Sequence, residues 1–180
     1  MIVVDLETTG VDPRKHSILS IGAVDFNNQE NYFYGECRIR EGALIDNYAL
    51  AVNGFTVEKI NNSEKSCEEL VREFHTWTKS INDRTLAGHN VHFDAGFLQE
   101  HFKFYNIEWS FRYRFVDLHS VFYAYLQKKE KEIPLKSNIS NLSLDYIIDY
   151  LKLNKREGNH NALEDARLTA KAFFILINEH

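Results

Sequence analysis

Runs of apolar residues, either continuous or alternating with polar ones, predict five β-strands. Ile2 to Val4 is wholly apolar and β-branched, which is typical of a strand buried on both faces at the centre of a sheet. Ser17 to Phe26 and Asn31 to Arg40 follow as strands, and Asn27 to Glu30 between them predicts a hairpin turn. Two further short strands are expected at Thr85 to Ala87 and Arg114 to Val116.

Helical spacing of apolar residues and capping residues predict the helices. Ser66 and Glu69 form a capping-box pattern, and the helix that follows carries Leu70 and Phe74 on one face. Asp117 is expected to cap a helix that runs to about Gln127. The other predicted helices cover His92 to Tyr105, Leu142 to Leu151 and Ala162 to Asn178.

The order of these elements predicts an α/β domain with a mixed central sheet, in which three early strands precede alternating strands and helices. We expect residues 1–180 to form a single domain, because internal repeats and Pro/Gly-rich linkers are absent from the sequence. The charged stretch from Gln127 to Asn138 is interpreted as a solvated loop.

Composition narrows the class of protein. Hydrophobic residues make up 44% of the chain, and no apolar run reaches the roughly 20 residues that a membrane span requires. The N-terminal apolar run meets an acid at Asp5, so a secretory signal is not expected and a cytoplasmic location is the simplest. Two cysteines, Cys37 and Cys67, exclude a disulfide framework.

The charge balance bears on nucleic-acid binding. Twenty-one Lys and Arg residues against 26 Asp and Glu residues give a net charge of −5. This balance argues against a general nucleic-acid binder, which usually carries a basic face. The negative net charge is compatible with an enzyme that binds nucleic acid through divalent cations, because each cation offsets two carboxylates.

Asp5 and Glu7 lie at positions i and i+2, where the first strand ends, so their side chains point to the same side. Two like charges at the end of a buried strand repel each other and resist desolvation. A divalent cation relieves both costs, and oxygen ligands favour magnesium or manganese. The alternative is a solvated pair of acids, a common pattern that recurs at Glu130 and Glu132.

The segment from Leu86 to Leu98 predicts a strand, a turn and a helix with Asp94 in its first turn. Taken alone, Asp94 is more simply interpreted as compensation of the helix dipole than as a metal ligand. His89 and His92 raise the possibility of zinc, but a Cys or third His at workable spacing is missing from the sequence.

His160 precedes a helix that begins near Asn161, and Asp165 lies one turn inside that helix. Gly158 gives the loop conformational freedom, so the imidazole and the carboxylate can face one cleft. An imidazole with a reference pKa of about 6.5 suits proton abstraction from water. The alternative is a surface histidine beside a helix start.

Three motifs in order resemble those of the DnaQ-like exonucleases, the DEDDh group of the ribonuclease H-like fold, and most closely the polymerase III ε proofreading domain. They are DLETTG, HNVHFDAGFL and HNALEDA, at Asp5–Gly10, His89–Leu98 and His160–Ala166. Weaker likeness at Leu50–Ile60 and Ser143–Leu153 extends the resemblance over essentially the whole chain. The fold expected from it is a mixed sheet, three antiparallel strands followed by parallel ones, flanked by helices.

The resemblance implies a two-metal 3′→5′ exonuclease that releases nucleoside 5′-monophosphates. Two Mg²⁺ or Mn²⁺ ions are expected on Asp5, Glu7, Asp94 and Asp165, with Asp5 bridging and His160 taking the proton of the attacking water. The terminal nucleotide is expected against the backbone from Leu6 to Thr9. Further substrate contacts are expected from Leu6, Thr8, Thr9, Asn90, Phe93, Phe55 and Val52, although core packing explains the aromatic residues equally well and Asn90 also suits bracing of its turn.

The expected partners are DNA 3′ ends, and a DNA polymerase subunit if the domain proofreads. Degradation of RNA ends is the alternative enzyme function, because contacts to the 2′-hydroxyl cannot be identified in the sequence. An inactive nucleic-acid-binding module is the non-enzyme alternative, but such a module is expected to lack a ligand or the histidine. No membrane partner is expected.

Overall fold

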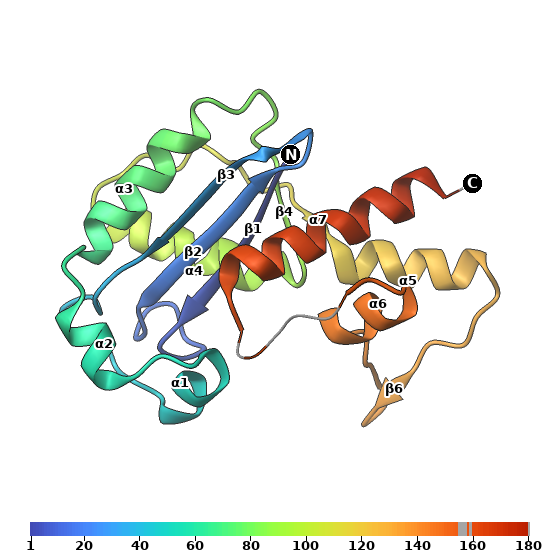
Figure 1. The fold of residues 1–180 in the computed structure, drawn as a ribbon, viewed down its shortest axis with the longest axis horizontal. Helices are drawn as coiled ribbons and strands as arrows, with labels where there is room; N and C mark the ends of the chain where they lie inside the picture. The colour runs from blue at the N-terminus through green and yellow to red at the C-terminus, as the bar shows by residue number, and fades with distance from the viewer. Residues whose placement is uncertain (155–157, 159, 180) are drawn as a thin grey trace.

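The computed structural model describes residues 1–154, 158 and 160–179, which form a central five-stranded sheet with the order β3-β2-β1-β4-β5 (Figure 1). Strands β1, β2 and β3 are antiparallel neighbours, whereas β4 and β5 run parallel to β1. The predicted α/β class with a mixed sheet is therefore confirmed. The strands are β1 (Ile2–Thr8), β2 (Ile18–Asp25), β3 (Asn28–Glu36), β4 (Leu86–Gly88) and β5 (Val116–Asp117).

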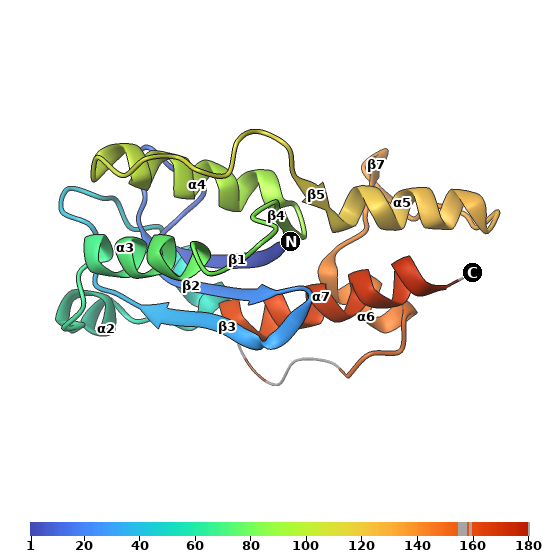
Figure 2. The same cartoon turned by 90° about the horizontal axis from the view of Figure 1, so that it is seen from above.

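Helices cover both faces of the sheet (Figure 2). Helices α3 (Cys67–Thr78) and α4 (Val91–Phe104) lie on one face, and α7 (Ala162–Asn178) crosses the other. Helices α5 (Leu118–Lys128) and α6 (Leu144–Tyr150) pack beside α7. Two short helices, α1 (Asn47–Asn53) and α2 (Val57–Asn62), lie near the carboxyl end of β1 (Figure 1).

The two core layers fix which way the side chains of β1 point. Ile2, Val4 and Leu6 belong to the apolar cluster with α3 and α4, whereas Val3 belongs to the cluster with α5, α6 and α7. Side chains alternate along a strand. Asp5 and Glu7 therefore point toward α7, on the same side as each other, as the sequence predicts.

Several boundaries differ from the predicted ones. Strand β1 continues to Thr8, so the two acids lie within it rather than at its end. The hairpin turn is tighter than predicted, because β3 already begins at Asn28. The predicted loop over Gln127–Asn138 is partly wrong, since β6 (Leu135–Lys136) pairs with β7 (Ile139–Ser140).

The two predicted helix caps are confirmed. Ser66 and Glu69 form the complete capping box of α3, and Asp117 caps α5 by accepting from Ser120 N. Cys37 and Cys67 are buried thiols. Among the described residues, no helix has both the length and the apolar character required to cross a bilayer.

Candidate active site

Asp5 and Glu7 stand at the centre of the sheet, where β1 lies between β2 and β4. Glu7 is only 7% exposed, and Asp5 is half-buried. In the ladder with β2, Asp5 pairs with Gly22 and Glu7 pairs with Ser20. The two acids therefore project from the central strand toward the first turn of α7.

Asp94 reaches the same strand from the opposite layer. The ladder between β1 and β4 ends at Val3 and Ala87, and beyond it the Leu6 N–H donates to Asp94 Oδ1 at 3.0 Å. Burial raises the pKa of the Asp94 carboxyl well above its usual value, and the nearby charges of Glu7 and Asp117 raise it further. Dipole compensation alone does not account for Asp94, because a residue with only that role would stay in solvent.

Asp165 is brought to β1 by an unusually close approach of α7 to β2. A Cβ placed on Gly22 would lie 2.1 Å from Ala162 C and 2.2 Å from Leu163 N, so only glycine fits there. Asn161 caps α7 by accepting from the N–H groups of Leu163 and Glu164. Asp165, one turn into α7, is consequently buried on the face of the sheet that carries Asp5 and Glu7.

His160 completes a compact group with two of the acids. Glu7, His160 and Asp165 each offer one ligand atom, and these atoms lie within 4.8 Å of one another. The His160 Nδ1 is 3.3 Å from Asp165 Oδ2, and its side chain is 39% exposed. Gly158 adopts a left-handed φ of 84°, while Asn159 lies outside the described residues.

This donor set fits a divalent cation. Glu7, Asp94 and Asp165 are three nearly fully buried carboxyl groups gathered around one strand, and such groups repel one another unless protons or cations offset their charge. Their ligand atoms are carboxylate oxygens, which hard cations such as Mg²⁺ and Mn²⁺ prefer.

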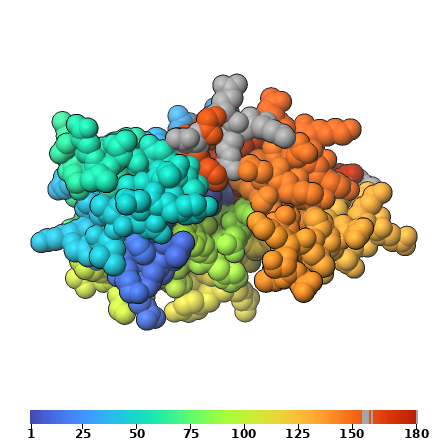
Figure 3. Space-filling view, turned by 90° about the horizontal axis from the view of Figure 1, so that it is seen from below, coloured from blue at the N-terminus to red at the C-terminus, as the bar shows by residue number. Residues whose placement is uncertain are grey.

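Two cavities flank the carboxylates. One of about 360 Å³ is lined by Glu7, Tyr34, Phe55 and His160, and one of about 480 Å³ by Asn90 and Asp117 together with other polar residues. Figure 3 shows the corresponding hollow between the cyan segment around α1 and α2 and the orange segment around β7 and α6.

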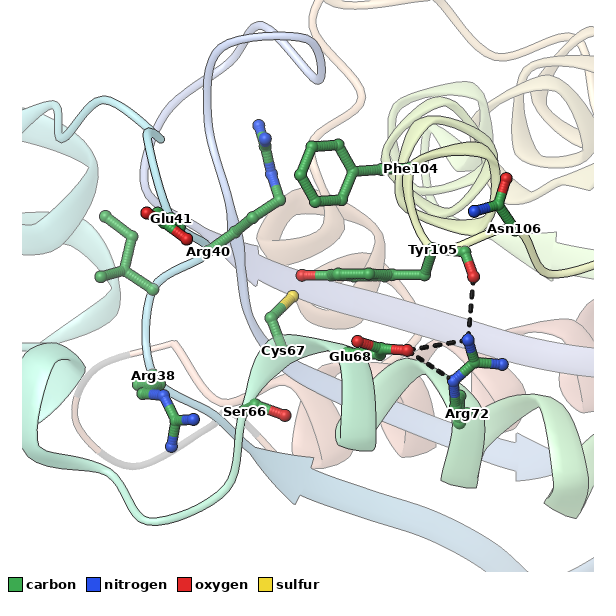
Figure 4. A pocket seen from close by; sticks show the side chains of 11 residues that line it. Arg38, Arg40, Glu41, Ser66, Cys67, Glu68, Arg72, Phe104, Tyr105 and Asn106 are labelled. Atoms are coloured by element: carbon green, nitrogen blue, oxygen red, sulfur yellow. Dashed lines mark hydrogen bonds and ion pairs between the residues drawn. The ribbon is translucent and has the colours of Figure 1, made fainter.

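A larger cavity of about 740 Å³ lies at the other end of α4, between Arg40, Arg72 and Tyr105 (Figure 4). Arg72 donates to Glu68 and to the Tyr105 carbonyl, and the Arg40 guanidinium lies 4.6 Å from the Phe104 ring centroid. Because α4 rises by roughly 1.5 Å per residue, this cavity lies far from Asp94 in its first turn.

The predicted substrate contacts divide into two groups. Thr8 and Thr9 are buried and donate their hydroxyls to the carbonyls of Gly10 and Leu44, while the Leu6 side chain is buried in the core. These three side chains are therefore engaged inside the protein. Phe55 lines the 360 Å³ cavity and Val52 is 39% exposed.

Phe93 and Asn90 lie at the start of α4. Phe93 is half-buried and packs on Phe97, with ring centroids 4.9 Å apart. Asn90 adopts a left-handed φ of 60°, is exposed, and makes no side-chain capping bond to α4. Its side chain therefore does not cap the helix, although the residue shapes the turn through its backbone.

Three residues that position the site were not identified from the sequence. Gly22 allows α7 to pack closely against the sheet, and the sequence indicated this only by placing a glycine inside a strand. Asn53 is 6% exposed, donates to Thr8 O at 3.0 Å and accepts from Phe55 N at 3.1 Å. Tyr34 donates to Glu36 Oε1 at 2.6 Å and accepts from Asn161 Nδ2 at 3.4 Å, beside His160.

A mixed sheet with acids on its central strand, and further acids delivered by a helix from each layer, defines a nuclease domain of the ribonuclease H-like class. The sequence profile of the RNase T exonuclease family, described as "Exonuclease", matches residues 2–173. The chain belongs to this family, the DEDDh 3′–5′ exonucleases, whose members use divalent metal ions.

Similar proteins include bacterial replication enzymes. The chain is 31% identical over 184 residues to DNA polymerase III subunit epsilon of Buchnera aphidicola subsp. Baizongia pistaciae, covering 97% of this chain and 69% of the relative. It is 29% identical over 176 residues to a PolC-type DNA polymerase III of Thermotoga maritima, covering 98% of this chain but only 12% of that protein. It is 28% identical to the 3′-5′ DNA exonuclease Cap18 of Escherichia coli, covering 97% and 90%.

Solved structures share the fold. E. coli exonuclease I in complex with a dT13 oligonucleotide superposes with a TM-score of 0.80 at 16% identity, covering 98% of this chain and 40% of that one. The nuclease domain of 3′hExo bound to rAMP superposes with a TM-score of 0.73 at 13% identity, covering 99% and 92%. These likenesses support the fold assignment.

Proposed function

We propose that this chain hydrolyses the terminal phosphodiester of single-stranded DNA from its 3′ end and releases nucleoside 5′-monophosphates, in proofreading or repair. The observation that carries the proposal is the convergence of Glu7, His160 and Asp165 within 4.8 Å, beside Asp94 on the Leu6 backbone. The names of the similar ε subunit and of the similar DNA exonuclease support DNA as the substrate.

We propose that Asp5, Glu7, Asp94 and Asp165 would hold two divalent ions, Mg²⁺ or Mn²⁺. When bound, the ions would supply the positive charge that activates the attacking water and stabilises the leaving 3′ oxygen. The protein holds these ligands on β1, α4 and α7, three elements of the packed core. Such preorganisation contributes to catalysis because little rearrangement is needed during the reaction.

His160 takes the proton from the attacking water in this proposal. Its ring is partly exposed at the 360 Å³ cavity, so water and substrate reach it, and its Nδ1 lies close to Asp165. A general base of this kind contributes about 10²–10⁴-fold to the rate. Phe55 provides an apolar wall for the terminal base or sugar, and Asn53 holds Phe55 against the end of β1.

Digestion of single-stranded DNA labelled at the 3′ or 5′ end tests the proposal. We expect immediate release of the 3′ label as a mononucleotide, a ladder of shortened 5′-labelled products, and complete loss of both with EDTA. A matched RNA oligomer tests whether the enzyme prefers deoxyribose or ribose. A rate on RNA far above that on DNA would reject DNA as the substrate. The Asp5→Ala variant is the control, because it removes one of the proposed metal ligands.

The proofreading role has its own test. An oligonucleotide annealed to a template presents either a paired or a mismatched 3′ terminus. A proofreading enzyme acts on frayed ends, so we expect faster release of the mismatched nucleotide. Equal rates on both ends would argue against proofreading and leave general 3′-end degradation.

A further inference from the structure

Three aromatic rings form a row that leads outward from the start of α4. His89 precedes the helix that carries Asp94, and its ring centroid is 6.5 Å from that of His119 on α5. The His119 ring is in turn 6.5 Å from that of Tyr123, tilted by 33°. Residues four apart share one face of a helix, and Tyr123 is 41% exposed.

The first two rings of this row, His89 and His119, border the 480 Å³ cavity beside the proposed active site, and Tyr123 lies beyond it on the same face of α5. His89, His119, Asn90 and Asp117 line the cavity, and the segment from Ser140 to Ser143 forms its opposite wall. The inner end of the cavity lies at the start of α4, where Asp117 accepts from Val91 N at 3.0 Å, one turn before Asp94. Burial lowers the pKa of His89, and the nearby charge of Asp165 opposes this shift.

Hydrogen bonds fix the two walls relative to each other. His119 Nε2 lies 2.8 Å from Ser140 Oγ on β7, and His89 Nε2 lies 2.8 Å from the Leu142 carbonyl. Each bond spans from the ring row to the opposite wall. These contacts within the protein therefore set the shape of the cavity.

The chemistry of the cavity suits a single nucleic-acid strand. Among its lining residues, only Asp117 is an acid, and the rest are histidines or neutral side chains such as Asn90, Ser120 and Asn141. Aromatic faces stack on any base, and neutral donors and acceptors tolerate all four bases. A purely structural role, in which the two histidines hold the cavity walls together, accounts for their hydrogen bonds. It does not account for the exposed Tyr123 ring that continues the row.

We propose that the row His89–His119–Tyr123 is the binding track for the nucleotides immediately 5′ of the scissile phosphodiester. The proposal rests on the proposed exonuclease function. It defines the substrate more narrowly, as a single strand that occupies several nucleotide positions beyond the terminal one, rather than a dinucleotide. The outer end of the track at Tyr123 takes the nucleotide farthest from the acids.

The test compares substrates that reach different distances along the row. Thymidine 5′-(p-nitrophenyl phosphate) contains one nucleotide and serves as the internal reference, and dT2, dT4 and dT8 extend outward. For the wild-type protein we expect kcat/KM to rise from dT2 to dT8. In Tyr123→Ala and His119→Ala we expect the ratio of kcat/KM for dT8 to that for the ester to fall about tenfold, as loss of one stacked base predicts.

Matched variants separate stacking from structural support. His119→Phe keeps a ring without the bond to Ser140, and Ser140→Ala removes the same bond from the other side, so both should retain the wild-type ratio. Tyr113→Ala removes an aromatic ring that is 81% exposed and lines a different cavity, and it should also leave the ratio unchanged. Thermal unfolding checks that each variant folds.

The outcomes distinguish the two proposals. If the wild-type protein cleaves neither the ester nor any oligonucleotide with Mg²⁺ or Mn²⁺, the proposed function fails. If it cleaves the ester while folded Tyr123→Ala and His119→Ala keep the wild-type ratio, only the track is overturned. The track is also overturned if Ser140→Ala and His119→Phe lower the ratio as much as His119→Ala does.

Discussion

Replacement of Gly22 by alanine tests whether the approach of α7 to β2 positions the active site. The added Cβ would lie 2.1 Å from Ala162 C, 1.3 Å short of the 3.4 Å at which ordinary van der Waals contact begins. The clashing atoms are backbone, and rotation of a side chain cannot relieve the overlap. Helix α7 must therefore shift by about an ångström at its first turn, which carries Asp165 and follows His160.

A displacement of this size has a large effect on rate and a moderate effect on stability. Misplacement of catalytic groups by about 1 Å reduces the rate on the order of 10²-fold. Overpacking costs roughly 1–3 kcal/mol of unfolding free energy. We expect Gly22→Ala to remain folded but to lose about two orders of magnitude in kcat on single-stranded DNA.

Two other glycines provide controls for the kinetic and thermal-denaturation assays. In Gly35→Ala the new Cβ meets a side-chain atom, Leu70 Cδ1 at 2.4 Å, so stability should fall while kcat is retained. In Gly96→Ala the nearest atom is Pro13 Cγ at 3.9 Å, and the helical position predicts a gain of up to about 1 kcal/mol. A Gly22→Ala protein with wild-type kcat would refute this account of the site.

Three further changes test individual side chains. His160→Ala should keep the fold and metal binding by calorimetry yet lose about 10²–10⁴-fold in kcat, and undiminished turnover at pH 7–8 would remove it from the mechanism. Asp94→Asn should abolish activity but raise the Tm of the metal-free protein at pH 7–8. Folding raises the pKa of Asp94, so the stability that Asp94 contributes is present below its unfolded pKa of about 3.9 and is lost as pH rises through the folded pKa. The gain in Tm from Asp94→Asn should therefore vanish near pH 4. A gain in Tm that is independent of pH would contradict this reasoning. Asn53→Ala should lower the free energy of unfolding by about 1–3 kcal/mol, because the Phe55 N–H loses its buried acceptor. The same substitution should raise KM. A lower kcat at unchanged KM would argue against the role of Asn53 in placing Phe55.

The sequence predicted the fold where local patterns and packing agree. The apolar run at the start of β1 and the capping box at Ser66 are local signals, and both elements formed where expected. Helices α1 and α2 have seven and six residues, too few for a periodic pattern, and were not predicted. They depend on the caps supplied by Asp46 and Thr56 and on contact with the end of β1.

The residues of the candidate site were named from the sequence, but the contacts that bring them together were not. Sequence order and spacing singled out the four acids and His160, whereas their convergence depends on contacts between distant segments. The bond from Leu6 to Asp94 spans 88 positions, and the bond from Asn53 to Thr8 spans 45. The fit of Gly22 beneath Ala162 is likewise a tertiary contact, so a strand glycine alone did not reveal it.

The bond between Asp94 and the Leu6 N–H also affects how such motifs should be interpreted in divergent relatives. Asp94 satisfies a buried backbone donor on the central strand, so its loss would weaken the fold even in a protein that had abandoned catalysis. Selection for folding alone would therefore retain an acceptor, aspartate or asparagine, at this position. His160 lies in a loop with a partly exposed ring and is under far less structural constraint. Across diverging sequences, the histidine should disappear before the acid does, which makes it the more sensitive marker of retained chemistry.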